Sequence, residues 1–160
     1  MASAADRTPR SNDRQGIALP VALFALIVIG ALVAGTFFAG RLEQQSGQNS
    51  FFAAQAAEAA EAGVAETVAD PAAAALETLP IGGPPADLGV LGLGDGITVH
   101  RQVSRLTTTL FIIRATGVRR DPAGTPLATR SAGLLVRLVA SPAGSTGLAP
   151  LPERAWVQLY

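Results

Sequence analysis

The feature that most constrains this chain is a run without any charged residue, IALPVALFALIVIGALVAGTFFAG, from Ile17 to Gly40. As an α-helix this run would extend about 36 Å, which is enough to cross the hydrocarbon core of a bilayer. The alternative is a buried core helix, but the rest of the 160-residue chain is too small to surround such a helix on all sides. The run therefore predicts a transmembrane helix.

The arginines on either side of the run predict its orientation. Arg7, Arg10 and Arg14 precede it, whereas Arg41 follows it closely. Cytoplasmic flanks carry an excess of basic residues, so we expect the N-terminus in the cytoplasm and the chain beyond Arg41 outside. A conventional cleaved signal peptide is a competing interpretation. It would have an apolar stretch of about 7–15 residues that ends in a small-x-small site, and this run is longer and lacks such a site near its end.

The helical signal continues beyond the apolar run. Residues 41–69 contain no proline and are dominated by Ala, Glu and Gln, which are good helix formers. A narrow apolar stripe recurs at helical spacing and comprises Ala53, Ala57, Ala60, Val64 and Val68. We expect one continuous helix from Ile17 to about Asp70, which ends at Pro71.

The stripe also predicts which side chains meet the rest of the chain. Ala57, Ala60 and Val64 should pack under a sheet, at a face where only small residues fit. Ala59 is turned about 100° from Ala60, so we expect it nearer the acidic face and outside the contact.

The remainder of the chain predicts a small antiparallel β-sheet. Residues 71–96 are rich in Gly and Pro and indicate a linker with a turn at Asp95-Gly96. Alternating or β-branched stretches then predict strands, which we place at residues 97–105, 107–118, 127–140 and 154–160. A sheet with one apolar face needs a cover, and the stripe of the long helix is the obvious candidate. The expected fold class is therefore α+β.

The charges differ in sign between these two parts. Residues 41–79 carry six acidic residues and one Arg, whereas residues 97–160 carry eight Arg and two acidic residues. An acidic helix and a basic sheet would complement each other within one subunit or between neighbouring subunits. The alternative is a pair of solvated surfaces that happen to differ in charge.

The sequence offers little material for catalysis. There is no cysteine, and His100 is the one histidine, on the expected polar face of a strand. No zinc-protease, nucleotide-loop or nucleophile-elbow motif occurs. We identify no catalytic, cofactor-binding or metal-ligating residue, and expect neither enzyme activity nor a cofactor. The zero net charge argues against direct nucleic-acid binding through phosphate neutralisation.

A resemblance to type IV prepilins comes from the start of the apolar run. Arg14-Gln15-Gly16 followed by Ile17-Ala18-Leu19-Pro20-Val21 resembles the class III prepilin signal. The run NSFFAAQAAEAAEAGVAE, residues 49–66, resembles the Asn-rich and then Ala-Ala-Glu-Ala pattern of PilX-like minor type IV pilins. FIIRATGVRR followed by TRSAGLLVRLV resembles the C-terminal sheet of that group more loosely.

This resemblance implies a processing site and a set of partners. A prepilin peptidase would cut after Gly16 and methylate the new N-terminus at Ile17. The subunit would wait in the inner membrane as a single-pass protein, and would then join other pilin subunits in a pilus or pseudopilus through an inner-membrane assembly platform. The resemblance thus implies a structural subunit that meets the lipid bilayer first and a filament later.

One position departs from the pilin pattern. The fifth residue after the expected cleavage site is Glu in most pilins, but here it is Val21. The resemblance therefore favours a minor subunit in a priming or tip position. The alternatives are an uncleaved, membrane-anchored binding module of the cell envelope and a conventionally secreted protein.

These interpretations divide the chain into five segments. We expect a cytoplasmic leader, the transmembrane half of the helix, an extracytoplasmic amphipathic half, a linker and a β-sheet head, at residues 1–16, 17–40, 41–70, 71–96 and 97–160.

Overall fold

The structure, a computed structural model, describes residues 15–71, 76–140, 146–152 and 156–159. The chain divides into two compact units, Met1–Ser46 and Gly47–Tyr160, and each is described separately. Most of the expected leader, residues 1–14, lies outside the described residues, whereas Gln15 and Gly16 are helical.

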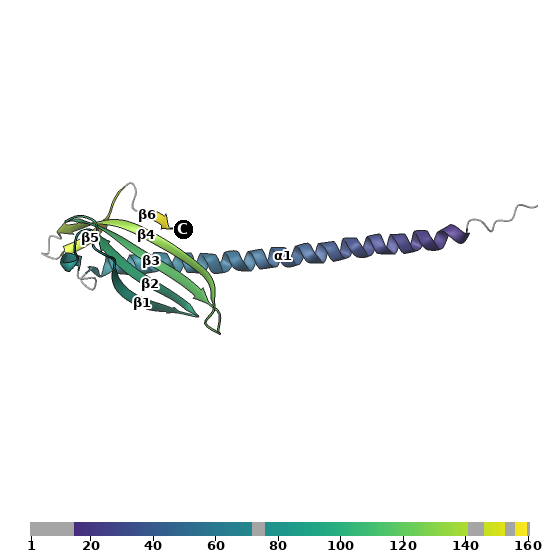
Figure 1. Cartoon of the computed structure of the whole chain (residues 1–160), viewed down its shortest axis with the longest axis horizontal. Helices are drawn as coiled ribbons and strands as arrows, with labels where there is room; N and C mark the ends of the chain where they lie inside the picture. The colour runs from purple at the N-terminus through teal and green to yellow at the C-terminus, as the bar shows by residue number, and fades with distance from the viewer. Residues whose placement is uncertain (1–14, 72–75, 141–145, 153–155, 160) are drawn as a thin grey trace, which may run out of the picture. The chain divides into compact units, whose positions relative to one another are not determined.

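The helix α1 comprises 55 residues, Gln15–Ala69 (Figure 1). Its bounds confirm the predicted continuous helix to within two residues at the start and one at the end. The first unit holds its apolar N-terminal part, and the second unit holds its Ala-rich C-terminal part together with all the strands. The helix ends where predicted because Pro71 cannot continue it.

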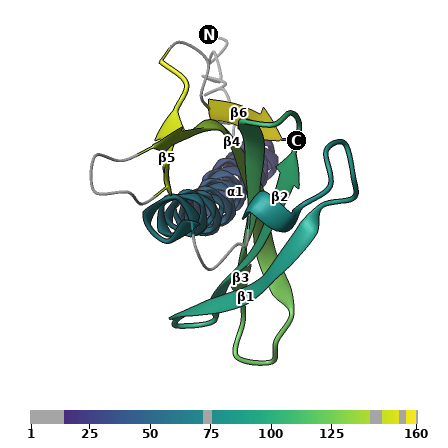
Figure 2. The ribbon, with the colours of Figure 1, turned by 90° about the vertical axis from the view of Figure 1, so that its left-hand side faces the viewer.

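The second unit is an antiparallel sheet packed on the C-terminal part of α1, so the fold is α+β as predicted. The strands follow a short 3₁₀ turn, η3 (Leu76–Thr78), and are β1 (Ala86–Gly94), β2 (Ile97–Arg105), β3 (Leu110–Arg120), β4 (Pro126–Ala140), β5 (Thr146–Pro150) and β6 (Trp156–Leu159). Their order is β1-β2-β3-β4-β5, and β6 also pairs with β4. Figure 2 shows this sheet with α1 lying against one of its faces.

The strand β1 corrects the predicted linker, because residues 86–94 of that segment form the edge of the sheet. The glycines that indicated a loop are accommodated by an irregular edge strand. The pairing with β2 shifts register at two places, and Gly89 and Gly94 both adopt positive φ. A strand that pairs on one side only tolerates such bulges. The predicted turn is confirmed: Asp95 and Gly96 both have positive φ between β1 and β2, as two-residue hairpins favour.

The other strands match the sequence unevenly. β2 has the predicted bounds, and β4 differs from its prediction by one residue. β3 begins at Leu110 rather than 107, because the hydroxyl of Thr107 accepts a hydrogen bond from the Leu110 backbone N–H and closes a turn there. β5 was not predicted, and β6 occupies part of the last predicted strand.

The core lies between the second half of α1 and the middle strands. Its buried side chains form one cluster, made of Ala60, Val64, Leu76, Val99, Val103, Phe111, Ile113, Ala115, Leu134 and Val136. A Cβ added to Gly117 of β3 would collide with the carbonyl oxygen of Ala56 and lie 2.8 Å from the backbone nitrogen of Ala60. A Cβ on Gly63 would lie 2.5 Å from a methyl of Val99. Helix and sheet therefore approach so closely that glycine is needed on both sides.

The buried face of α1 is wider than the predicted stripe. Ala60 and Val64 are completely buried and Val68 packs against the cluster, whereas Ala53 and Ala57 are half-buried. Ala59 was predicted to lie outside the contact, and this is wrong, because only 3% of its surface is exposed. The glycine at position 117 lets β3 reach round the helix far enough to cover Ala56 and Ala59 as well.

Candidate functional site

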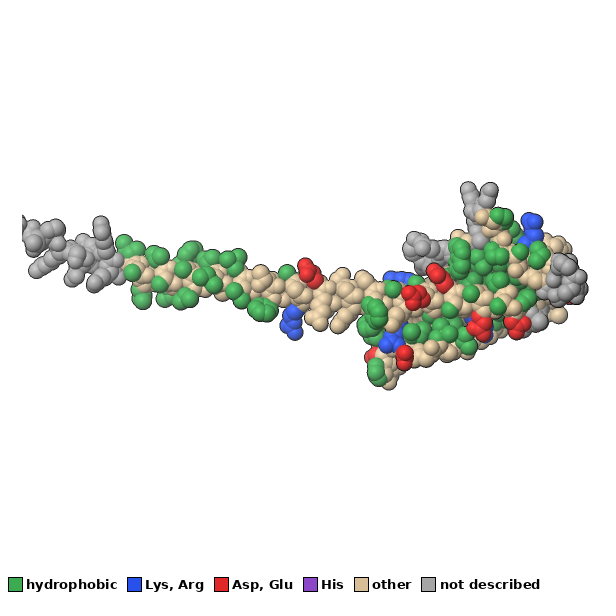
Figure 3. Space-filling view, turned by 180° about the vertical axis from the view of Figure 1, so that it is seen from behind, with side chains coloured by type: hydrophobic (Ala, Val, Ile, Leu, Met, Phe, Trp, Pro, Cys, Tyr) green, Lys and Arg blue, Asp and Glu red, His purple; other side chains and the backbone are tan. Residues whose placement is uncertain are grey.

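The apolar part of α1 is the candidate functional site of the first unit. Every described side chain from Ile17 to Ser46 is exposed, including large apolar ones such as Leu19 at 73% and Phe37 at 71%. In Figure 3 hydrophobic side chains line this part of the helix, without acidic or basic ones before the first charged pair. In the sequence this pair is Arg41 and Glu43. The helix is long and apolar enough to cross a membrane.

The energetics of these side chains favour lipid over water. Each Leu, Ile, Phe or Val near the centre of a membrane helix contributes about 0.3–0.6 kcal/mol to insertion. The same side chains in water would leave a large apolar surface uncovered, which soluble proteins avoid. The arrangement can therefore anchor the chain in a membrane.

The predicted processing residues lie at the very start of this helix. Gly16 is its second residue and Ile17 its third. Val21 follows within two turns, and 59% of its surface is exposed. Its side chain adds to the apolar surface, so the helix carries no carboxylate in its described residues before Glu43.

The sequence left open whether the acidic helix and the basic sheet of the second unit pair with each other or face solvent. Within the described residues, the helix and sheet are joined by an ion pair between Glu66 and Arg101, with 3.5 Å between Oε1 and Nη1. Glu58 and Glu61 instead lie on exposed positions of α1, and Arg114 of β3 is exposed as well. Complementary charges of the helix and the sheet therefore meet at the Glu66–Arg101 pair, whereas Glu58, Glu61 and Arg114 are exposed.

Arg105 is an important residue that the sequence did not single out. Its guanidinium donates hydrogen bonds to the carbonyls of Glu77, Leu79, Thr107 and Thr108, at distances of 3.0–3.2 Å. It also lies over the ring of Phe111, with 5.6 Å to the ring centroid. This side chain ties the segment after α1 to the turn between β2 and β3, which is a structural role.

His100 takes part in a small polar cluster at the sheet edge. Its Nε2 lies 2.8 Å from Oδ1 of Asp87, and the same oxygen accepts a hydrogen bond from the backbone N–H of Gly89. The Gly89 hydrogen bond, and then the one with His100, hold the pKa of Asp87 below its usual value. The Asp87 side chain is 63% exposed and that of His100 37%, and their hydrogen bonds hold the bulge of β1 in place.

The described residues contain no group of His, Asp and Glu side chains that could hold a metal ion. Comparison with protein-family models, curated proteins and solved structures found no match to this chain. The resemblance to type IV pilins therefore remains a prediction from the sequence.

Proposed function

We propose that the chain is a structural minor subunit of a type IV pilus or a related pseudopilus, anchored in the inner membrane before assembly. The single observation that carries the proposal is the organisation of α1. One uninterrupted helix begins beside the prepilin-like Gly16-Ile17 sequence, exposes large apolar side chains first, and packs small ones under a sheet later. A subunit that moves from a bilayer into a helical bundle needs both kinds of surface on one helix.

The proposal assigns roles to the start of the helix. Prepilin peptidase would remove the leader after Gly16 and methylate Ile17, and the assembly platform would then add the subunit to other pilins. Val21 would leave the N-terminal amine of a neighbour without the carboxylate that most pilins supply. This favours a priming or tip position, where one of the two usual neighbours is missing.

A second candidate is an uncleaved, single-pass binding module of the cell envelope. The observation that favours it is the same Val21, because without a carboxylate the apolar run is indistinguishable from an ordinary membrane anchor. The two candidates differ in the covalent state of the N-terminus. Mass spectrometry of the mature chain separates them, with N-methyl-Ile17 expected for the pilin and an intact leader for the anchor.

Substitution of Gly16 tests the processing step directly. We expect Gly16→Val to abolish leader removal when the chain is co-expressed with a prepilin peptidase, because a subsite that fits glycine excludes a branched side chain. The loss of about 16 residues is visible as a gel shift in the unmodified chain.

The matched control is Gly35→Val in the same helix, where an added side chain meets no atom within 4 Å. The control should be processed normally. Normal processing of Gly16→Val would contradict the prepilin interpretation.

A further inference from the structure

In the second unit, which we call the head, the face of α1 that points away from the sheet is acidic and lined by small residues. Glu58 and Glu61 are exposed there, together with Ala54, Ala62 and Ala65. No described residue lies within salt-bridge distance of either carboxylate. Small side chains beside the carboxylates would let a flat surface approach this face closely.

The outward face of the sheet is basic around an apolar centre. Residues two apart in a strand share a face, so Arg114 lies on the same side of β3 as Ile112 and Leu110. Leu110 is paired with Arg137 of β4, and Ile112 with Leu135. Arg114 and Arg137 are exposed, Leu110 and Leu135 are half-buried, and Ile112 between them is buried.

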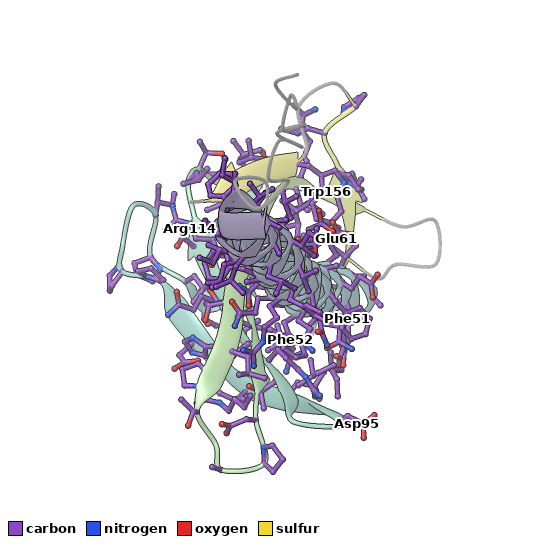
Figure 4. The ribbon with its side chains drawn as sticks, turned by 90° about the vertical axis from the view of Figure 1, so that its right-hand side faces the viewer. Phe51, Phe52, Glu61, Asp95, Arg114 and Trp156 are labelled. Carbon is purple, nitrogen blue, oxygen red and sulfur yellow. The ribbon has the colours of Figure 1, made fainter. Side chains whose placement is uncertain are left out.

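These two faces cannot meet within one chain. Phe111, Ile113 and Ala115 alternate with the residues just named and face α1, so Arg114 points away from the helix. Figure 4 shows Arg114 and Glu61 on opposite sides of the head. An acidic face and a basic face on opposite sides of one body complement each other only when two bodies stand side by side.

We propose that a second copy of this chain docks its Glu58–Glu61 helix face onto the Arg114–Arg137 sheet face. Such a contact is heterologous, because each copy contributes a different surface, and it leaves one face of each kind free for a further copy. The inference goes beyond the proposed function, since a minor subunit need not contact its own kind.

The contact depends on the membrane for its strength. Exposed ion pairs contribute about 0–1 kcal/mol each, which is too little to hold two free heads together at low concentration. Anchored helices confine the heads to one layer and raise their effective concentration. We therefore expect the contact between full-length chains in a bilayer, and expect it to weaken at high salt.

The absence of cysteine makes disulfide cross-linking a clean test. Glu61→Cys and Arg114→Cys are placed in two full-length chains with tags of different size, and both are reconstituted into vesicles of zwitterionic lipid and oxidised. We expect a mixed dimer at least about ten-fold more abundant than the dimer formed by either variant alone. The helix face of the Glu61→Cys chain on the sheet face of the Arg114→Cys chain brings two cysteines together, whereas a contact between two like chains holds only one.

The matched control replaces Arg114→Cys with Asp95→Cys, which is exposed at the β1–β2 turn and away from the proposed face. It should give only background cross-linking with Glu61→Cys. Equal yields for the two pairs would overturn the proposal, and so would efficient cross-linking of Glu61→Cys with itself, which indicates a symmetric contact.

Charge exchange provides a second measurement. The cysteines of the cross-linking pair are now Glu58→Cys in one chain and Arg137→Cys in the other. When both chains also carry Glu61→Arg, or both carry Arg114→Glu, the yield of mixed dimer should fall several-fold. When both chains carry the two charge changes together, the yield should be restored. Failure of the restoration would overturn the charge pairing. The N-terminal mass of the same samples reports leader removal separately, so this inference can fail while the proposed function stands, and the reverse.

Discussion

The two halves of α1 have the same secondary structure and opposite relations to their surroundings. From Ile17 to Gly40 the helix exposes Leu, Ile, Val and Phe on every side. From Ala56 to Thr67 it buries one face made almost entirely of Ala, Gly and Val against the sheet. The difference teaches that side-chain size, more than hydrophobicity, separates the exposed apolar half of this helix from the half that packs on protein.

The physical reason lies in what each half gains by burial. Large side chains gain transfer free energy in lipid without needing any particular neighbour. Small side chains gain little from transfer, but they let two backbones approach, and the packing contacts then depend on the shape of the partner. The first half should therefore tolerate changes of shape but not of charge, whereas the buried face of the second half should not tolerate added bulk.

The largest effect is expected at the closest point of the helix–sheet contact. Gly117→Val places a branched side chain against the Ala56 carbonyl, and we expect a loss of about 3 kcal/mol or more in the free energy of unfolding. Denaturant unfolding of the full chain in detergent, followed by the fluorescence of Trp156, measures it.

Gly35→Val is the matched control in the apolar half, where nothing lies within 4 Å of an added side chain. It should unfold at the wild-type denaturant concentration. Equal midpoints for the two variants would remove the distinction between the halves.

A charge in the apolar half should have the next largest effect. Leu26→Arg costs about 2.5–3.5 kcal/mol of insertion free energy at the centre of a membrane helix. We expect a clear drop in the fraction of chain that resists alkaline extraction from membranes. Gln45→Arg, in the exposed polar part of the helix, should remain fully membrane-bound, and equal extraction of both variants would argue against a spanning helix.

Bulky substitutions should distinguish the faces of the second half. Ala60→Phe and Ala59→Phe each overpack a buried position, and we expect each to lower the stability by about 1–3 kcal/mol. Ala62→Phe is the control, because Ala62 is exposed and surface changes stay within about 0.5 kcal/mol. Thermal unfolding of the head ranks the three, and a mild Ala59→Phe would restore the narrower stripe expected from sequence.

The smallest effect is expected from acid at the sheet edge, away from the helix contact. The pKa of Asp87 is lowered from 3.8 in the folded chain, so its ionised form stabilises β1 above that value. This contribution is lost as pH falls through the lower, folded-state pKa. Protection of the β1 amides against hydrogen exchange, corrected for the intrinsic exchange rate at each pH, should fall as the pH drops below 3.8, and Asp87→Asn should remove that fall. An unchanged profile in the variant would assign the acid sensitivity elsewhere.

Much of the fold could be predicted from local patterns in the sequence. The helix, its end at Pro71 and the strand β2 were predicted correctly. A long uncharged run followed by helix-forming residues predicts a helix, and alternating apolar residues predict a strand. β1 was missed because its glycines also favour loops, and only pairing with β2 fixes them in a strand. The burial of Ala59 was missed because it depends on Gly117, a residue far away in sequence.

The features of the candidate site also divide into those that the sequence predicted and those that it did not. The apolar run was recognised from its composition, and the structure confirms a helix that is long and apolar enough to span a membrane. Cleavage after Gly16 and methylation of Ile17 remain predictions, since they depend on another protein. The role of Arg105 could not be predicted, because its four acceptors are backbone carbonyls, which every residue possesses.

Arg105 also bears on the order in which the head folds. Two of its carbonyl partners precede β1 and two lie in the turn after β2, and its own carbonyl accepts a hydrogen bond from Gly82. The guanidinium can bind all four carbonyls only after β2 and the turn that follows it have formed. The short-range β2–β3 hairpin should thus form first, since closing a small loop costs little entropy. The segment between α1 and β1, which holds the Glu77 and Leu79 carbonyls, should then be fastened to the sheet only after this hairpin has formed.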